Sequence, residues 1–324
     1  MRVPALVMLV LATTLAAAGC GDSGGEGGSG GGEAAVVATT TIAGDLVDNV
    51  GGERVEVDTL VPAGADPHGH EPRPSDAVAI AEADLVVKSG GDLDEWLDDL
   101  IENAGGEAAE LTLLDSVEPI EGGHAHAEDE AHGEDEAHGE DVDPHWWQDP
   151  RNAILATEAI RDALTEADPD GRRAYERNAR AYIAELRALD DEIERCMQRV
   201  PPGRRKLVTT HDSLGYFADR YDVEVIGSVI PSLSTQAQPS AKDVDALVEQ
   251  IEDEGLAAIF PEAAVSQRLE RAISRESGAE IGDELWTDSL GDDGSGAETY
   301  LDAMRANANA LAEGMSGGRV SCGG

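Results

Sequence analysis

One long amphipathic pattern divides the chain into two halves. Between residues 170 and 200, apolar side chains recur mostly at steps of three and four, which places them on one face of a helix. These side chains are Tyr175, Tyr182, Leu186, Leu189, Ile193, Met197 and Val200. Such a helix would be roughly 45 Å long, enough to run beside two lobes. Pro169 precedes the pattern and Pro201-Pro202-Gly203 follows it, so we expect a stiff linker helix over 169–202.

On each side of this pattern, short apolar runs alternate with helical patterns. Before it, the sequence predicts strands at 34–41, 55–61, 84–89 and 108–114, and helices at 74–83, 92–103 and 151–166. After it, the predicted strands are 206–211, 223–230, 256–260 and 279–286, and the predicted helices are 212–221, 240–254, 266–277 and 297–315. This alternation indicates βαβ units. We therefore expect an α/β fold of two lobes, 33–168 and 203–324, each with a parallel sheet flanked by helices.

Residues 1–19 have the pattern of an export signal. Arg2 supplies a positive charge, and an apolar run follows that is too short to span a bilayer. Small residues then precede Cys20, which resembles a bacterial lipobox, although Ala17 stands where leucine is usual. Residues 20–32 are rich in glycine and would form a flexible tether. We expect a soluble body that meets the membrane only through a lipid on Cys20.

The charge balance narrows the range of partners. The 324 residues include 67 acidic and 23 basic side chains, for a formal net charge of −44. This excess argues against nucleic acid, whose phosphates are neutralised by lysine and arginine, and against electrostatic docking on an anionic membrane. It favours cations, although an acidic surface by itself is common in soluble proteins.

Two cysteines remain after Cys20, namely Cys196 and Cys322. Disulfides persist in exported proteins, so we expect these two to be bonded and to hold the C-terminus in place. Two cysteines are too few for a cysteine-based zinc finger.

Residues 121–143 form an acidic, histidine-rich stretch in which EDEAHG occurs twice. It contains ten carboxylates and four histidines but no lysine or arginine, so we expect a loop without a core. Imidazole suits Zn²⁺ and other borderline metals, so this loop could capture metal weakly; alternatively it only keeps the protein soluble. The histidines are His124, His126, His132 and His138.

Three further histidines and one aspartate follow predicted strands or lie in loops that can reach their ends. His68 lies in DPHGHEP, His145 in DPHWWQD, His211 at the end of KLVTTH and Asp288 in WTDSL. In parallel α/β sheets this edge is where ligands bind. Three imidazoles and a carboxylate complete a tetrahedral Zn²⁺ shell and leave no position for an activated water. Such a site would hold a metal rather than catalyse with it, but no local spacing proves that the four residues meet.

These segments resemble those of the solute-binding proteins that deliver zinc or manganese to ABC importers. The likeness rests on DPHGHEPRPSD, DPHWWQDPRNA, HDSLGYFADRYDVEVIG and TDSLGDDGSGAETYLDAM, and it extends from about Val36 to the last helix. It implies that His68, His145, His211 and Asp288 bind the metal and that one long helix joins two α/β lobes. The acidic histidine-rich loop and VIPSLSTQAQPSAKD resemble zinc-specific members.

Neighbouring residues are candidates for supporting roles. His70 is expected to face solvent or to support a ligand rather than to bind the metal, and Glu262 could either support a ligand or replace Asp288 as the fourth. Metal-bound histidines usually donate their second N–H to an acceptor, for which Asp66, Glu71, Asp143 and Asp149 are available. Trp146, Trp147 and Trp286 could either keep the metal dry or simply pack between the lobes.

The resemblance implies an exported, high-affinity zinc-binding protein and not an enzyme. It would be a lipid-anchored monomer on the outer face of the cytoplasmic membrane, on its periplasmic side or at the cell surface. Its partners would be an ABC permease with its ATPase and, for loading, a metallochaperone. Manganese members often carry a carboxylate where His211 stands, which favours Zn²⁺ over Mn²⁺ here. The alternatives are a manganese- or iron-binding member, a cell-adhesion protein, a zinc buffer, and a zinc hydrolase, which Pro72 and Arg73 disfavour.

Overall fold

The computed structural model describes residues 33–122 and 142–323. The predicted export signal, Cys20, the tether and the four loop histidines lie outside these residues. Among the described residues, no helix combines the length and the apolar character that a membrane span requires.

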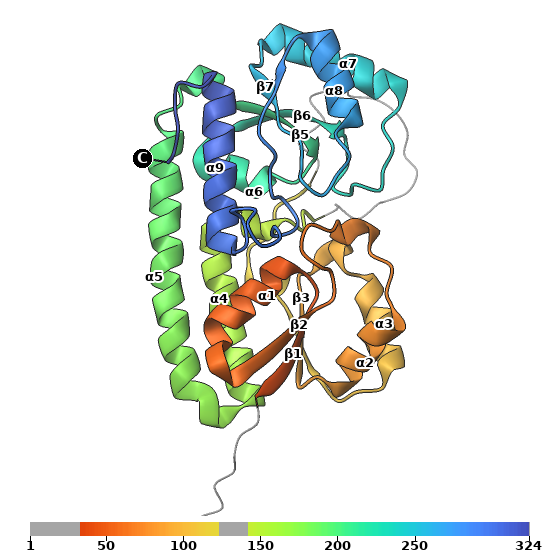
Figure 1. Cartoon of the computed structure of the whole chain (residues 1–324), viewed down its shortest axis with the longest axis vertical. Coiled ribbons are helices and arrows are strands. Elements are labelled where there is room, and N and C mark those ends of the chain that lie inside the picture. The colour runs from red at the N-terminus through yellow and green to blue at the C-terminus, as the bar shows by residue number, and fades with distance from the viewer. Residues whose placement is uncertain (1–32, 123–141, 324) are drawn as a thin grey trace, which may run out of the picture. The chain divides into compact units, whose positions relative to one another are not determined.

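The first lobe is built on a four-stranded parallel sheet in the order β2-β1-β3-β4 (Figure 1). Its strands are β1 (Ala34–Ala38), β2 (Val55–Thr59), β3 (Leu85–Lys88) and β4 (Ala109–Thr112), and its helices are α1 (Thr41–Gly51), α2 (Pro74–Glu82), α3 (Trp96–Ala104) and α4 (Pro150–Ala167). Successive strand residues point to opposite faces. Val37 packs with α2 and α3, whereas Val36 packs with α1 and α4. Both faces are covered, which explains why the two central strands, β1 and β3, are nearly continuous apolar runs.

Helix α1 was not predicted from the sequence. Thr40 caps its N-terminus, where its hydroxyl accepts a hydrogen bond from the backbone N–H of Ala43. Leu46, Val47 and Val50 are fully buried on its inner face. Gly44 and the β-branched residues lower helix propensity and obscured the pattern. The glycine is required by packing, because a Cβ there would lie 2.7 Å from the hydroxyl oxygen of Thr59 on β2.

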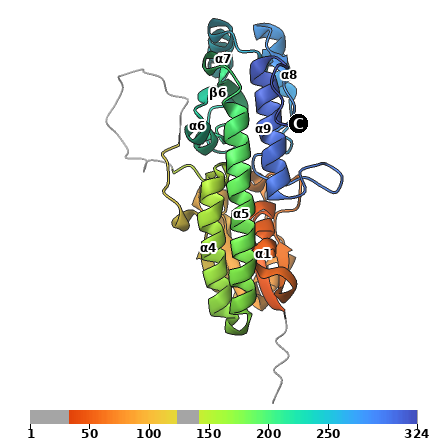
Figure 2. The same cartoon turned by 90° about the vertical axis from the view of Figure 1, so that its left-hand side faces the viewer.

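The long helix is α5 (Arg172–Met197), and it contacts α1, α4 and α9. Figures 1 and 2 show it running along both lobes, next to α1, α4 and α9. It begins later than the pattern predicts because Pro169–Gly171 form a separate 3-10 turn. The whole predicted apolar stripe is buried, so the helix is a packed support for both lobes and not a surface linker.

The second lobe has two parallel strand pairs joined by a bridge between Thr209 and Phe260. Its strands are β5 (Lys206–His211), β6 (Glu224–Ile230), β7 (Ala258–Ile259) and β8 (Glu280–Ile281), and its helices are α6 (Gly215–Tyr221), α7 (Ala241–Glu254), α8 (Arg268–Ser277) and α9 (Tyr300–Ser316). Strand β8 is shorter than the predicted 279–286. Gly282, Asp283 and Glu284 have low strand propensity, and pairing resumes only in a single bridge from Leu285 to Glu262.

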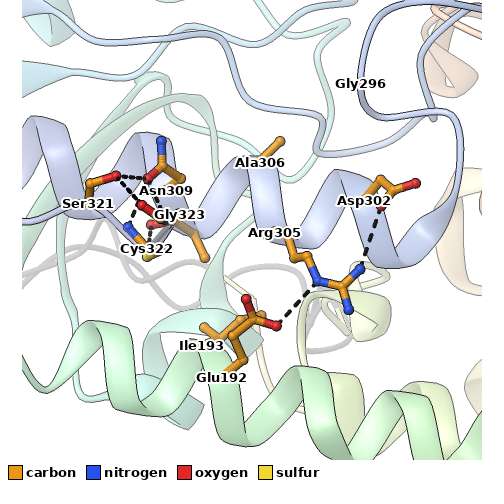
Figure 3. A pocket seen from close by; sticks show the side chains of 11 residues that line it. Glu192, Ile193, Gly296, Asp302, Arg305, Ala306, Asn309, Ser321, Cys322 and Gly323 are labelled. Carbon is orange, nitrogen blue, oxygen red and sulfur yellow. Dashed lines mark hydrogen bonds and ion pairs between the residues drawn. The ribbon is translucent and has the colours of Figure 1, made fainter.

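Cys196 at the end of α5 is bonded to Cys322 near the C-terminus, with Cα atoms 5.4 Å apart. Beside this disulfide lies a surface pocket of about 300 Å³ between α5 and α9 (Figure 3). Arg305 pairs there with Glu192 at 3.3 Å and with Asp302 at 3.5 Å, so its charge is already compensated. None of the predicted metal ligands lines this pocket.

Candidate metal centre

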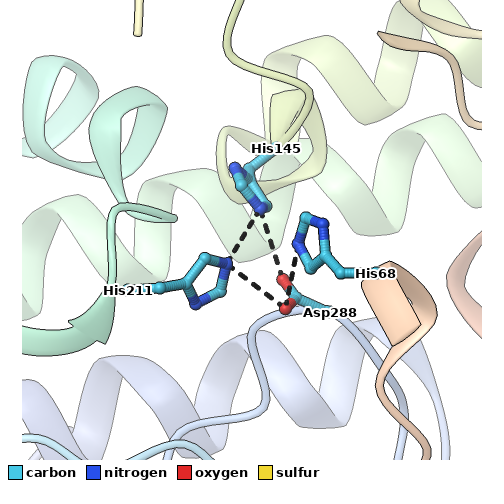
Figure 4. Close-up of side chains that lie close together, drawn as sticks. All are labelled: His68, His145, His211 and Asp288. Atoms are coloured by element: carbon cyan, nitrogen blue, oxygen red, sulfur yellow. Dashed lines mark hydrogen bonds and ion pairs between the residues drawn. The ribbon is translucent and has the colours of Figure 1, made fainter. Parts of the chain in front are cut away.

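The four predicted ligands lie together although they are distant in sequence (Figure 4). One potential ligand atom from each of His68, His145, His211 and Asp288 lies within 4.8 Å of the others. His211 is the last residue of β5, and Asp288 lies in the loop between the Leu285 bridge and α9. His68 is in a 3-10 turn, Pro67–Gly69, and His145 directly precedes another, Trp146–Gln148. All four side chains are at most 3% exposed.

Four of the distances between these atoms are close to those around one small ion. Nε2 of His211 lies 3.2 Å from Nε2 of His145 and 3.4 Å from Oδ2 of Asp288. Oδ1 of Asp288 lies 3.6 Å from Nε2 of His145, and Oδ2 of Asp288 lies 3.8 Å from Nε2 of His68. Ligand atoms about 2.0–2.1 Å from a tetrahedral Zn²⁺ are separated by roughly 3.4 Å.

Two atoms of the cluster are buried without a hydrogen-bond partner among the described residues. They are Nε2 of His68 and Oδ1 of Asp288. Leaving such atoms unsatisfied costs free energy, and an ion between them removes that cost. The donor set, its spacing and these two atoms therefore fit a bound divalent cation.

Two of the imidazoles are oriented by buried carboxylates. Nδ1 of His145 donates to Oδ1 of Asp143 at 2.7 Å, and Nδ1 of His211 donates to Oε2 of Glu262 at 2.6 Å. The backbone N–H groups of both histidines donate to the same carboxylates. Each carboxylate thus holds the proton on Nδ1 and presents Nε2 to the cluster, as metal-binding histidines require.

His68 is held differently. Its backbone N–H donates to Oδ1 of Asp66 at 2.9 Å, and Oδ2 of Asp66 accepts from the hydroxyl of Thr235 at 2.6 Å. Among the described residues, no carboxylate accepts a hydrogen bond from the ring of His68. Asp66 therefore positions the turn that carries His68 and not its imidazole.

Burial and neighbouring charges shift the protonation of the cluster. Burial, reinforced by His145 and His211, lowers the pKa of His68 to about 2. Burial also opposes the protonation of His211, but Glu262 and Asp288 outweigh it and raise the pKa of His211 to about 10. Burial raises the pKa of Asp288 to about 6, against the opposing effect of His211 and His145. Without a metal, His211 is therefore protonated at neutral pH.

The structure distinguishes among the predicted supporting residues. Glu262 pairs with His211 rather than replacing Asp288, and Asp143 is the acceptor for His145. Asp149 instead caps α4 and pairs with Arg151, while Glu71 is exposed.

His70 lies outside the four-residue cluster. Its Nε2 is 3.5 Å from Asp76, and its ring centroid is 4.9 Å from that of Trp96.

The three predicted tryptophans differ in their relation to the cluster. Trp147 packs edge-on against His145 with ring centroids 5.5 Å apart. Trp146 donates to the backbone oxygen of Ser89, and Trp286 is only half-buried. Among the described residues, Trp147 is therefore the only one of the three tryptophans whose ring pairs with the ring of a candidate ligand.

Sequence reasoning missed the residues that hold the loop of Asp288. The hydroxyl of Thr41 accepts from the backbone N–H of Leu290 at 2.9 Å, and Nε2 of Gln148 donates to the carbonyl of Thr287 at 2.8 Å. No motif signals these bonds, because they join residues more than a hundred positions apart.

Most of the chain is similar to proteins of one known family. A family model described as zinc-uptake complex component A, periplasmic, matches residues 36–314. The chain is 33% identical over 309 residues to the manganese-binding lipoprotein MntA of Halalkalibacterium halodurans, covering 95% of this chain and 97% of that protein. It is 29% identical over 317 residues to ScaA of Streptococcus gordonii, a manganese ABC transporter substrate-binding lipoprotein, covering 96% and 98%.

Solved structures of metal-binding proteins have a similar fold. The periplasmic zinc-binding protein TroA of Treponema pallidum superposes with a TM-score of 0.78 at 25% identity, covering 88% of this chain and 100% of that one. The manganese-bound periplasmic metal-binding protein of Candidatus Liberibacter asiaticus gives 0.75 at 28% identity, covering 86% and 98%. These relatives are binding proteins and not enzymes. The chain therefore belongs to the zinc-uptake complex component A family, the extracytoplasmic metal-binding lipoproteins of ABC transporters.

Proposed function

We propose that this protein captures Zn²⁺ outside the cytoplasmic membrane and delivers it to the permease of an ABC importer driven by an ATPase. The observation that carries the proposal is the buried set of three imidazole Nε2 atoms and one carboxylate, with separations near those of a tetrahedral shell. All four positions are filled by protein atoms, which suits holding and releasing an ion.

Zinc is favoured over manganese by the donor atoms. Imidazole suits Zn²⁺, whereas Mn²⁺ prefers carboxylate, carbonyl and water oxygens. Manganese remains the second candidate, because MntA and ScaA are named for that metal. His211 is the informative position, since it supplies the third imidazole.

A competition titration against zinc chelators of known affinity tests the binding site. The wild-type chain from Glu33 onward should bind one Zn²⁺ tightly, and His211→Ala should weaken that site more than about 100-fold, beyond the usual effect of changing a supporting residue. His70→Ala is the matched control, because His70 is buried nearby but outside the cluster, and it should keep the tight site. Weak binding at several sites, unchanged by His211→Ala, would refute the proposal.

Selectivity needs its own measurement. His211→Glu replaces a nitrogen ligand by an oxygen ligand and should lower the ratio of Zn²⁺ affinity to Mn²⁺ affinity. If the wild-type protein already binds Mn²⁺ more tightly than Zn²⁺ under the same conditions, manganese becomes the cargo.

Residues 123–141 of the acidic histidine-rich stretch, which lie outside the described residues, would be an accessory that concentrates cations. Deleting residues 123–141 should remove weak zinc binding and leave the tight site unchanged. The lipid on Cys20, the monomeric state and a metallochaperone belong to the same proposal. Membrane fractionation of Cys20→Ala tests the lipid anchor.

A further inference from the structure

The loop that carries Asp288 belongs to the second half of the chain, but its hydrogen bonds reach the first lobe. The carbonyl oxygen of Thr287 accepts from Nε1 of Trp147 at 2.6 Å and from Nε2 of Gln148 at 2.8 Å. The acceptor and both donors belong to buried residues. The residue directly before the ligand is therefore fixed by the segment that follows His145.

The residues after the ligand are fixed by a second part of the first lobe. The hydroxyl of Thr41, at the start of α1, accepts from the backbone N–H of Leu290 at 2.9 Å and lies 3.4 Å from the hydroxyl oxygen of Ser289. The backbone N–H of Gly64 lies 2.9 Å from both the Ser289 hydroxyl and the Leu290 carbonyl. Gly64 has φ +67, which glycine adopts without strain.

Bonds to the second lobe flank this loop. The backbone of Trp286 pairs with the side-chain amide of Asn307, and the N–H of Gly291 donates to Ala297. Between these flanks, the hydrogen bonds of residues 287–290 to other described segments go to the first lobe. His211 is different, because Glu262, which orients its ring, lies in its own lobe.

We propose that Thr41 is a positioning residue for the metal ligand Asp288, acting from the opposite lobe through the backbone of Leu290 and the hydroxyl of Ser289. This inference rests on the proposed metal-binding function. Thr41 contacts no ligand atom itself. Its hydroxyl fixes where the Asp288 carboxylate points, so zinc affinity depends on a side chain that no metal-binding motif contains.

Thr41→Val tests the proposal cleanly. Valine keeps the shape of threonine and removes only the hydroxyl, and the cap of α1 remains because Thr40 supplies it. We expect zinc affinity to fall about tenfold, as for other residues that orient metal ligands. Thr41→Ser keeps the hydroxyl and should restore the affinity. Thr165→Val is the matched control, because among the described residues that hydroxyl bonds only to the carbonyl of Arg161 in its own helix.

Double variants distinguish positioning from a general loss of stability. With Asp288→Ala, three imidazoles remain to bind Zn²⁺, and adding Thr41→Val should change the affinity less than twofold. In the Glu262→Gln background, where the change affects His211 instead, adding Thr41→Val should still lower zinc affinity about tenfold. If adding Thr41→Val lowers zinc affinity equally in both backgrounds, or in none, Thr41 does not position Asp288. Absence of tight zinc binding in the wild-type protein would instead refute the proposed function.

Discussion

Nδ1 of His211 lies 2.6 Å from Oε2 of Glu262, and both side chains are at most 1% exposed. The other carboxylate oxygen of Glu262 accepts from the backbone N–H of His211 at 3.1 Å. One glutamate therefore fixes both the backbone and the ring of this ligand. The pair decides which ring nitrogen of His211 faces the other three candidate ligands.

Glu262→Gln should weaken Zn²⁺ binding by about 10–100-fold. The ring and the backbone N–H of His211 bond different oxygens of Glu262, and glutamine places an NH₂ group where one of these oxygens lies, so one of the two hydrogen bonds is lost. A chelator competition titration measures the change. Glu249→Gln, an exposed substitution on α7, is the control and should leave the affinity unaltered. An affinity for Glu262→Gln equal to that of the wild type would show that the ring of His211 needs no carboxylate.

Zinc binding should release protons. Because carboxylates raise the pKa of His211 to about 10, the metal-free site holds a proton there at pH 7.5, and Zn²⁺ must displace it. The pKa of His68, about 2, leaves that ring neutral, and Asp288, with a pKa of about 6, is largely ionised at pH 7.5. We expect about one proton released per Zn²⁺ at pH 7.5, rising toward two below about pH 6.

Isothermal titration in buffers of different ionisation enthalpy measures this release. The apparent affinity should rise about tenfold per pH unit between pH 7 and 8, and more steeply below pH 6, because protons compete with the metal for the same atoms. Binding at pH 7.5 without proton release would contradict the protonated state of His211.

The sequence was sufficient for most of the framework. Buried strands such as β3 are short apolar runs, and the stripe of α5 has clear helical periodicity, so both were predicted to within a few residues. Helix α1 was missed because its glycine serves a close approach to β2, a tertiary requirement that lowers the local signal.

The candidate ligands could be named from motifs, whereas their surroundings could be named only as a list of candidates or not at all. Glu262 and His211 are 51 positions apart, and Thr41 and Leu290 are 249 apart. Side-chain contacts between segments so distant depend on how the lobes pack, which periodicity does not encode. Motifs therefore named the candidate ligands, and Glu262 and Asp143 were among the candidates for supporting roles, but only the fold showed which carboxylate pairs with which histidine.

Asp45→Asn should stabilise the protein at neutral pH. Oδ2 of Asp45 accepts from the hydroxyl of Tyr182 and the backbone N–H of Tyr300, both at 3.2 Å. Burial is the largest cause that raises the pKa of Asp45 to about 6. The folded state thus favours the protonated form, and stability that is present below about pH 4 is lost as pH rises to about 6. Asparagine keeps an acceptor oxygen without the charge.

We expect Asp45→Asn to raise the free energy of unfolding by about 1–2 kcal/mol at pH 7.5 and to have little effect at pH 4. Urea denaturation at the two pH values measures both. Asp58→Asn, on the exposed side of β2, is the control and should change neither. An equal gain at both pH values would mean that the charge of Asp45 is not the cause.

The Cys196–Cys322 bond should contribute to stability without contributing to the metal site. The bonded cysteines are 126 positions apart. A disulfide across a segment of this length is expected to raise the free energy of unfolding by about 2–5 kcal/mol, largely because it restricts the unfolded chain. Denaturation of the variant with both cysteines changed to alanine measures the loss. A phosphine reductant should destabilise the wild-type protein by a similar amount and leave the double variant unchanged.

Zinc affinity should be the same in the double variant and the wild type, because neither cysteine contacts a ligand or Glu262. A parallel loss of affinity would mean that the C-terminal segment shapes the site through α9, whose Asn307 holds the backbone of Trp286 two residues before Asp288. Asn307→Ala distinguishes an effect of α9 from an effect of the disulfide, because it removes the hydrogen bonds to the backbone of Trp286 and leaves the disulfide intact. If Asn307→Ala weakens zinc binding and the double variant does not, the ligand loop is anchored by α9 itself and the disulfide serves stability alone.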